Sequence, residues 1–329
     1  MTWCLHNKYS TKFNQMESKS VRMRTFNHHV VLFLGFASSI TSIFTFIAFS
    51  PTASAATLYE VDYDTGKINT ISATGVVTPF ATGLNTPIGL AFDASGTLFE
   101  IGTNTINKIS PTGVVTPFVT TILQPRALAF DASGILFVSD SSTNTINKIS
   151  PTGAITPFAT GIQAVSLAFD ASGNLFAGDI SSRPASINKI SPTGVVTPFA
   201  TTGTRFFSPF SLAFDANGNL FEGDLTQNTI NNISATGVVT SFATGLSPSA
   251  LAFDPSGNLF AADFYTGEIK KISATGVVTP FATGFSAPYA LAFGPDPIST
   301  AVPEPFTMIG TLVGGTAAFR VRKKLKAAD

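Results

Sequence analysis

Leu167-Ala-Phe-Asp-Ala-Ser-Gly-Asn-Leu-Phe176 decides the fold, because the chain carries four further versions of this stretch. The other versions begin at Leu90, Leu128, Leu212 and Leu251, and a shortened one, LAFG, begins at Leu291. Successive starts are 38, 39, 45, 39 and 40 residues apart. Self-similarity at a period of about 40 residues is the signature of a repeat architecture.

Each repeat is predicted to form four short β-strands. L-A-F-D is the first strand, and it ends in a D-A-S-G turn whose glycine, such as Gly134 or Gly173, is expected to take a positive φ. L-F and the residues after it form the second strand, and I-N-K-I-S is expected to be a half-buried third strand. An S-P-T-G turn then leads into V-V-T-P-F-A-T, the fourth. Four antiparallel strands in about 40 residues are typical of a β-propeller blade.

The two ends of the repeat region fix the number of blades. Leu58–Thr82 has a second, third and fourth strand without a first, whereas Leu291–Gly294 is a first strand without a successor. The LAFG strand should therefore close the ring by entering the first blade. With the five complete repeats, this predicts an all-β, six-bladed β-propeller over residues 56–296. The unit ALAFDASGNLF followed by INKISPTG resembles NHL-type and gluconolactonase-like six-bladed propellers over residues 57–295, and the resemblance implies fold more than activity.

Residues 1–55 are expected to serve transport rather than the fold. Lys19, Arg22 and Arg24 precede an apolar run, Val30–Phe49, and the small-x-small pattern Ala53-Ser54-Ala55 follows. This order predicts a signal segment that signal peptidase cleaves at Ala53 and Ala55. The alternative is a permanent membrane helix, since the run is about long enough to span a bilayer.

Composition excludes several function classes. Cys4, His6, His28 and His29 are the only cysteine and histidines, and all precede residue 56. Disulfides, Cys/His zinc sites and His-based nucleophilic triads are therefore excluded from the remainder, and we expect no metal and no cofactor. Residues 56–300 hold 16 Asp/Glu and nine Lys/Arg, a net charge of −7, which argues against nucleic-acid binding.

The loops fall into two sets, which a propeller places on opposite faces. First-to-second and third-to-fourth turns repeat D-A-S-G and S-P/A-T-G with little change, and we call their side the uniform face. Second-to-third turns and fourth-to-first connections differ in every blade and define the variable face. Loops on a rigid scaffold usually carry binding, although drift in unconstrained loops would give the same variation.

One position at the channel mouth on the variable face differs in all six blades. It is occupied in turn by Ile88, Arg126, Val165, Phe210, Ser249 and Tyr289. Arginine and aromatic side chains are the usual anchors of binding surfaces. Ligand binding is therefore predicted for Arg126, Phe210 and Tyr289, with Arg205, Phe206 and Phe207 from the longest connection. A plugged mouth is the alternative.

Acidic residues recur at two positions of the second strand. Five strands end in an aspartate: Asp62, Asp140, Asp179, Asp224 and Asp263. We expect each to cap its own second-to-third turn, and an anionic ring is the alternative. Glu60, Glu100 and Glu222 share a position two residues earlier and are interpreted as blade-edge residues rather than general acids. Asp62–Gly66 matches a calcium loop poorly, because no glutamate stands at the twelfth position.

The C-terminal residues 297–329 resemble a PEP-CTERM sorting signal. Val302-Pro303-Glu304-Pro305 is followed by the apolar run Phe306–Phe319 and the basic segment Arg320–Lys326. The resemblance implies cleavage by an exosortase-type enzyme while a short transmembrane tail holds the chain in the inner membrane. Basic residues after an apolar run favour the cytoplasmic side, although 14 helical residues span only about 21 Å. A C-terminal amphipathic helix on the propeller is the alternative.

Together these features predict an exported, surface- or matrix-directed propeller that binds a glycan or protein ligand without catalysis. The runner-up is a metal-dependent lactonase-like hydrolase. Gluconolactonase-like propellers hold a divalent metal with Glu, Asp and Asn of the inner strands, whereas the inner strands here carry their only carboxylate in the far turn. Streptogramin-lyase-like propellers need a histidine, and residues 56–329 contain none.

Overall fold

The computed structural model describes residues 25–26, 29–30, 56–181, 183–201 and 209–297. The chain divides into two compact units, Met1–Ser54 and Ala55–Asp329. In the first, β1 (Thr25–Phe26) pairs antiparallel with β2 (His29–Val30). The predicted cleavage residues Ala53 and Ala55 and the sorting signal at 302–305 lie outside the described residues.

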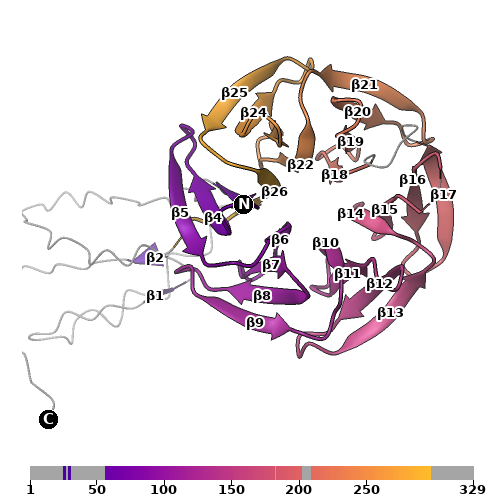
Figure 1. Ribbon diagram of the computed structural model, residues 1–329, viewed down its shortest axis with the longest axis horizontal. Helices are drawn as coiled ribbons and strands as arrows, with labels where there is room; N and C mark the ends of the chain where they lie inside the picture. The colour runs from indigo at the N-terminus through magenta and orange to yellow at the C-terminus, as the bar shows by residue number, and fades with distance from the viewer. Residues whose placement is uncertain (1–24, 27–28, 31–55, 182, 202–208, 298–329) are drawn as a thin grey trace, which may run out of the picture. The chain divides into compact units, whose positions relative to one another are not determined.

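The second unit is a β-propeller with six four-stranded antiparallel sheets, or blades, arranged around a common axis (Figure 1). This confirms the predicted fold class and blade number. Blade 1 contains β26 (Pro288–Gly294), β3 (Thr57–Asp62), β4 (Lys67–Ile71) and β5 (Val77–Thr82). Blade 2 contains β6 (Gly89–Phe92), β7 (Leu98–Gly102), β8 (Thr105–Ile109) and β9 (Val115–Val119). Blade 3 contains β10 (Pro125–Phe130), β11 (Leu136–Asp140), β12 (Thr145–Ile149) and β13 (Ile155–Thr160).

The remaining blades follow the same order from the axis outward. Blade 4 contains β14 (Ala164–Phe169), β15 (Leu175–Asp179), β16 (Ser186–Ile190) and β17 (Val196–Thr201). Blade 5 contains β18 (Ser211–Phe214), β19 (Leu220–Asp224), β20 (Thr229–Ile233) and β21 (Val239–Thr244). Blade 6 contains β22 (Pro248–Phe253), β23 (Leu259–Asp263), β24 (Glu268–Ile272) and β25 (Val278–Thr283). The first strand of each blade lines the channel. Within these ranges the structure holds no helix with the length and apolar character needed to cross a membrane.

The ring closes as the two leftover segments predict. Strand β26 pairs antiparallel with β3, from Pro288 opposite Asp62 to Gly294 opposite Thr57. Leu291 is buried, and Phe293 packs edge-on against Phe260 of blade 6 with ring centroids 5.4 Å apart. The first and last strands of the propeller therefore belong to one blade.

Apolar side chains fill the spaces between neighbouring blades. Phe99 packs edge-on against Phe118 of its own blade and against Phe130 of the next, with centroids 5.5 and 5.0 Å apart, so repeated phenylalanines join neighbouring blades. The third strand is buried on both faces rather than on one. Ile106 and Ile109 stand three residues apart, so they face opposite sides of the sheet, and each joins the core cluster of a different neighbour.

Backbone hydrogen bonds join the two sets of variable loops. Within blade 1, the N–H of Tyr63 in the second-to-third turn donates to the carbonyl of Ala287 just before the inner strand, at 2.9 Å. The N–H of Ser141 makes the equivalent bond in blade 3, to the carbonyl of Gln124. These bonds place both sets of loops on the same face, as predicted, and hold them against the channel mouth.

Candidate functional site

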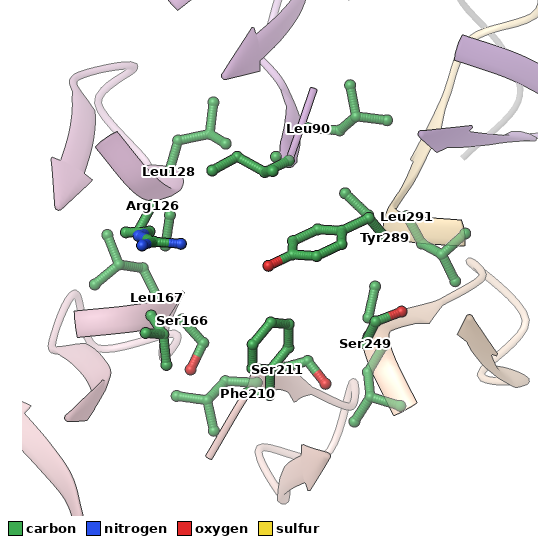
Figure 2. Close-up of a pocket in the computed structure, with 18 residues that line it drawn as sticks. Leu90, Arg126, Leu128, Ser166, Leu167, Phe210, Ser211, Ser249, Tyr289 and Leu291 are labelled. Atoms are coloured by element: carbon green, nitrogen blue, oxygen red, sulfur yellow. The ribbon is translucent and has the colours of Figure 1, made fainter. Parts of the chain in front are cut away.

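A channel runs between the six inner strands, and its lining includes all six predicted mouth residues. The cavity there has a volume of about 130 Å³. Figure 2 shows Arg126 and Tyr289 extending toward each other from opposite sides of the channel, with Phe210 beside them. The structure thus brings these three predicted site residues together. Arg205, Phe206 and Phe207 lie outside the described residues.

A β-bulge sets the direction of several of these side chains. Opposite β3, Pro288 pairs with Asp62 and Ala290 pairs with Val61, so Tyr289 is the extra residue between them. The same shift makes Val165 the extra residue of β14 and Ser249 that of β22. Arg126 lies within a longer shift of the same kind in β10. A bulge changes the direction in which a side chain points, so the mouth residues leave the regular face of their strands.

A second cavity, of about 560 Å³, opens on the variable face next to the channel, and we call it the face cavity. It shares Arg126, Val165, Phe210 and Tyr289 with the channel. The rest of its lining comes from the variable loops of blades 3 to 6: Ser141, Gln163, Ile180, Leu225, Thr226, Asn228, Phe264 and Tyr265. Its volume lies within the roughly 300–1,000 Å³ typical of small-molecule sites.

Aromatic rings form one wall of the face cavity. Tyr289 stacks on Tyr63 with centroids 5.5 Å apart and an interplanar angle of 29°. It also meets Phe210 and Phe264 edge-on, at 5.5 and 6.1 Å. Phe264 in turn packs edge-on against Tyr265, whose side chain is 77% exposed. Phe264, Tyr265 and Tyr63 were not among the predicted site residues, although aromatic residues in variable turns were a visible signal.

Arg126 brings a charged group to the lining, across the channel mouth from Tyr289 (Figure 2). The guanidinium Nε of Arg126 donates to the Ser141 hydroxyl at 3.5 Å, and that hydroxyl donates to the Gln124 carbonyl at 3.2 Å. Arg126 is the only charged residue in the lining and forms no ion pair with the residues that the structure describes. Burial raises the pKa of Tyr289 to about 12, an effect that nearby Arg126 partly offsets. The Tyr289 hydroxyl therefore keeps its proton at neutral pH and can donate a hydrogen bond.

Channel-lining serines bond to the neighbouring blade. The hydroxyls of Ser166, Ser211 and Ser249 donate to the carbonyls of Pro209, Pro248 and Pro288, at 2.9, 3.4 and 2.7 Å. Pro248 and Pro288 begin the inner strand of the next blade, and Pro209 stands two residues before it. These serines hold the ring together at the channel mouth.

The aspartates that end the second strands act mainly as turn caps. A carboxylate oxygen of Asp62, Asp140, Asp179 and Asp224 accepts a hydrogen bond from a backbone N–H two or three residues later, at 2.8–3.2 Å. Asp263 instead accepts the N–H of Ser247, in the connection before its inner strand. The prediction is confirmed for four of the five residues.

The interpretation of Glu60, Glu100 and Glu222 as blade-edge residues is wrong. Each lies on a second strand, between the first and third, and is fully buried. Each accepts a hydrogen bond from the asparagine opposite it: Asn69 at 2.9 Å, Asn107 at 2.7 Å and Asn231 at 2.7 Å. Burial raises the pKa of Glu60 to about 9 and that of Glu100 to about 7. Val138, Ala177 and Ala261 hold the same position in the other blades.

A lactonase-type metal centre does not fit the residues present at the channel. Its lining offers one arginine, one tyrosine and three serines as polar side chains. Over the described ranges, no three His, Cys, Asp or Glu side chains gather closely enough to hold a metal ion. The buried glutamates lie in separate blades and bond to separate asparagines.

No protein-family model matches the chain, and no curated protein matches it. Several solved structures share the fold. A chain of the nidogen/laminin complex gives a TM-score of 0.66 at 21% identity, covering 73% of this chain and 99% of that chain. A candidate gluconolactonase gives 0.60 at 14% identity, covering 69% and 91%. A catalytically inactive histidine-to-alanine variant of virginiamycin B lyase from Staphylococcus aureus gives 0.55 at 15% identity, covering 74% and 94%. At these identities the likeness shows the fold alone.

Proposed function

We propose that the chain is an exported, non-catalytic binding propeller, directed to the cell surface or extracellular matrix, whose ligand occupies the face cavity. The observation that carries the proposal is the lining of that cavity. Apart from Asn228, whose position is asparagine in three blades, its residues come from positions that differ between blades, so the repeat does not require them. Exposed aromatic rings at such positions favour a glycan, because aromatic faces stack on sugar rings.

Catalysis is less well supported by the residues present. The virginiamycin B lyase structure is described as inactive after loss of a histidine, and residues 56–329 of this chain contain no histidine. The gluconolactonase-like alternative requires a metal centre, which the channel lining does not offer. Binding needs only the cavity that the fold already provides.

A glycan array followed by calorimetry on the purified protein tests the binding role. Replacing Phe210 and Tyr289 with serine should abolish binding of whichever glycan the array identifies, since both rings line the cavity. Ser133→Ala on the uniform face is the control and should bind as the parent does. Calcium-dependent hydrolysis of a lactone by the same protein would favour the hydrolase instead.

Peptide mapping of the extracellular product tests the proposed export and sorting. The product should contain no residue beyond about Pro305, because an exosortase-type enzyme is expected to cut at Val302–Pro305. Changing Glu304 to alanine should leave a longer form bound to the membrane. Recovery of secreted protein that still carries Lys326 would contradict the sorting proposal, while the binding proposal would be unaffected.

A further inference from the structure

The face cavity carries a positive charge in a domain that is otherwise acidic. Residues 56–300 have a net charge of −7, yet among the residues that the structure describes the only charged one lining this cavity is Arg126. No carboxylate among the described residues pairs with its guanidinium. An arginine that lines a cavity without a carboxylate partner is available to an anionic ligand, and its planar group matches a carboxylate with two parallel hydrogen bonds.

Four aspartates directly precede lining residues, and each accepts a backbone N–H. Asp140, before Ser141, accepts that of Ser142 at 2.9 Å, and Asp263, before Phe264, accepts that of Ser247 at 3.2 Å. Asp179, which directly precedes Ile180, is buried and accepts hydrogen bonds from the N–H groups of Gln163 and Ser181 at 3.1 and 2.8 Å. Asp224, which directly precedes Leu225, is fully buried and accepts the N–H of Thr226 at 2.8 Å. None of these aspartates lines the cavity, so the lining presents one positive charge, neutral polar groups and apolar side chains.

The lining of the cavity combines aromatic rings with polar groups, so a ligand that fits it must have both an apolar surface and polar groups. Tyr289, Phe210 and Phe264 offer ring surfaces, whereas Arg126, Ser141 and Gln163 offer polar groups. Arg126 and Tyr289 extend toward each other across the channel mouth (Figure 2). A purely apolar ligand would leave the guanidinium desolvated and unpaired, which is costly. A small inorganic anion would make no use of the rings.

We infer that the face cavity binds a carboxylated sugar, with the carboxylate on Arg126 and the ring against the aromatic wall. A sugar-acid ring presents C–H faces that pack on aromatic rings, hydroxyls for Ser141 and Gln163, and one carboxylate. This inference rests on the proposed binding function and names the class of its ligand. Arg126 would then be the residue that selects acidic over neutral saccharides.

Calorimetry with matched oligosaccharides tests the inference on the full-length chain. The probes are tri-galacturonic acid, its methyl ester, which has the same rings without the charges, and a neutral hexose trisaccharide. The acid should bind at least about tenfold more tightly than the ester, since hydrogen bonds to charged groups are roughly twice as strong as neutral ones. Arg126→Gln should bring both affinities to the same value. Arg126→Lys should restore only part of the preference, because an ammonium group lacks the planar fork.

Lys67→Gln is the matched charge control. Lys67 is exposed at the start of β4, lies outside the cavity lining, and its loss changes the net charge as much as the loss of Arg126. It should leave the acid-to-ester ratio unchanged.

Equal affinity for acid and ester, or a preference that survives Arg126→Gln, overturns the carboxylate assignment. If the serine variants of Phe210 and Tyr289 still abolish binding of another array ligand, the proposed binding function stands. Absence of binding to every saccharide and protein probe overturns both.

Discussion

The two faces of the propeller use their polar side chains in different ways. On the uniform face, Asp131 accepts hydrogen bonds from the N–H groups of Ser133 and Ile135, at 3.0 and 2.8 Å, so its carboxylate closes the turn that carries it. Ser110 does the same for its own turn by accepting the N–H of Val114. On the variable face, Arg126 and Tyr289 point into cavities and differ from their counterparts in other blades. A polar residue that recurs at one position in successive blades stabilises the backbone of its turn. A residue that differs between blades is not needed for the turn, so its side chain can serve binding.

Glycine-to-alanine substitutions should give the largest difference in stability between the two faces. Gly113 on the uniform face has a φ of 82°, and an added Cβ would lie 2.1 Å from the Phe80 carbonyl oxygen of the preceding blade. Gly161 on the variable face has a φ of 77°, but an added Cβ would meet no atom within 4 Å. We expect Gly113→Ala to lower the free energy of unfolding by about 4 kcal/mol and Gly161→Ala by about 1 kcal/mol. Denaturant unfolding measures both, and equal losses would contradict the inter-blade contact.

The buried glutamates are an exception to this rule, because their position differs between blades and yet lies inside the fold rather than on a face. The folded pKa of Glu60, about 9, lies above its ordinary value of 4.5. The folded chain therefore holds the proton more tightly, and the stability that this gives below pH 4.5 is lost as pH rises toward 9. The free energy of unfolding should fall by about 1.4 kcal/mol per pH unit in that window, or about 3 kcal/mol from pH 6 to 8.

Glutamine variants identify the source of that pH dependence. Glu60→Gln should remove most of the slope between pH 6 and 8, since the amide oxygen can still accept from Asn69 and carries no charge. Glu100→Gln should remove slope mainly below pH 7, because the pKa of Glu100 is raised only to about 7. Unfolding curves at several pH values measure this. A slope that persists in Glu60→Gln would show that Glu60 is ionised in the folded chain.

Removing a turn cap should cost an intermediate amount. Asp131→Ala deletes the acceptor of three hydrogen bonds, from the Ser133 N–H, the Ser133 hydroxyl and the Ile135 N–H. We expect a loss of about 1–2 kcal/mol in the free energy of unfolding. Arg126→Ala should change it by less than about 0.5 kcal/mol, because that side chain is exposed and weakly bonded. A larger cost for Arg126→Ala would mean that the variable face also supports the fold.

Tyr265 should show the smallest effect on stability and a large one on binding. Its side chain is 77% exposed, so Tyr265→Ser should leave the free energy of unfolding within about 0.5 kcal/mol of the parent. Affinity for the cavity ligand should drop about tenfold, since one ring of the aromatic wall is lost. Calorimetry and denaturant unfolding on the same preparation measure both. Unchanged affinity would remove Tyr265 from the binding wall.

Much of the fold was predictable because the same strand and turn pattern occurs in several copies along the chain. The period, the two leftover segments and the D-A-S-G turns predicted six blades, ring closure and positive φ at Gly134 and Gly173, which are 83° and 79°. Burial of Glu60 was not predictable in the same way. It depends on ring closure, which places Leu291 of β26 opposite Glu60 within blade 1, more than 200 positions away in the chain.

The candidate site was predictable only in part. Comparing equivalent positions located Arg126, Phe210 and Tyr289 at the channel mouth. The bulge that turns Tyr289 off its strand follows from pairing between β26 and β3, which no local pattern records. The aromatic wall joins Tyr289 to Phe264 and Tyr265 of another blade, so its formation also required the closed ring.

The pairing of β26 with β3 also constrains how the protein is made. A ribosome completes β3 long before residues 288–294 exist, so the first blade of the nascent chain lacks its inner strand almost until synthesis ends. Until then, β3 presents an unpaired edge and the ring cannot close. Closure must join segments more than 200 residues apart, which makes it a late and slow step of folding. A chain whose last strand completes its first blade therefore keeps its ring open until synthesis is nearly finished.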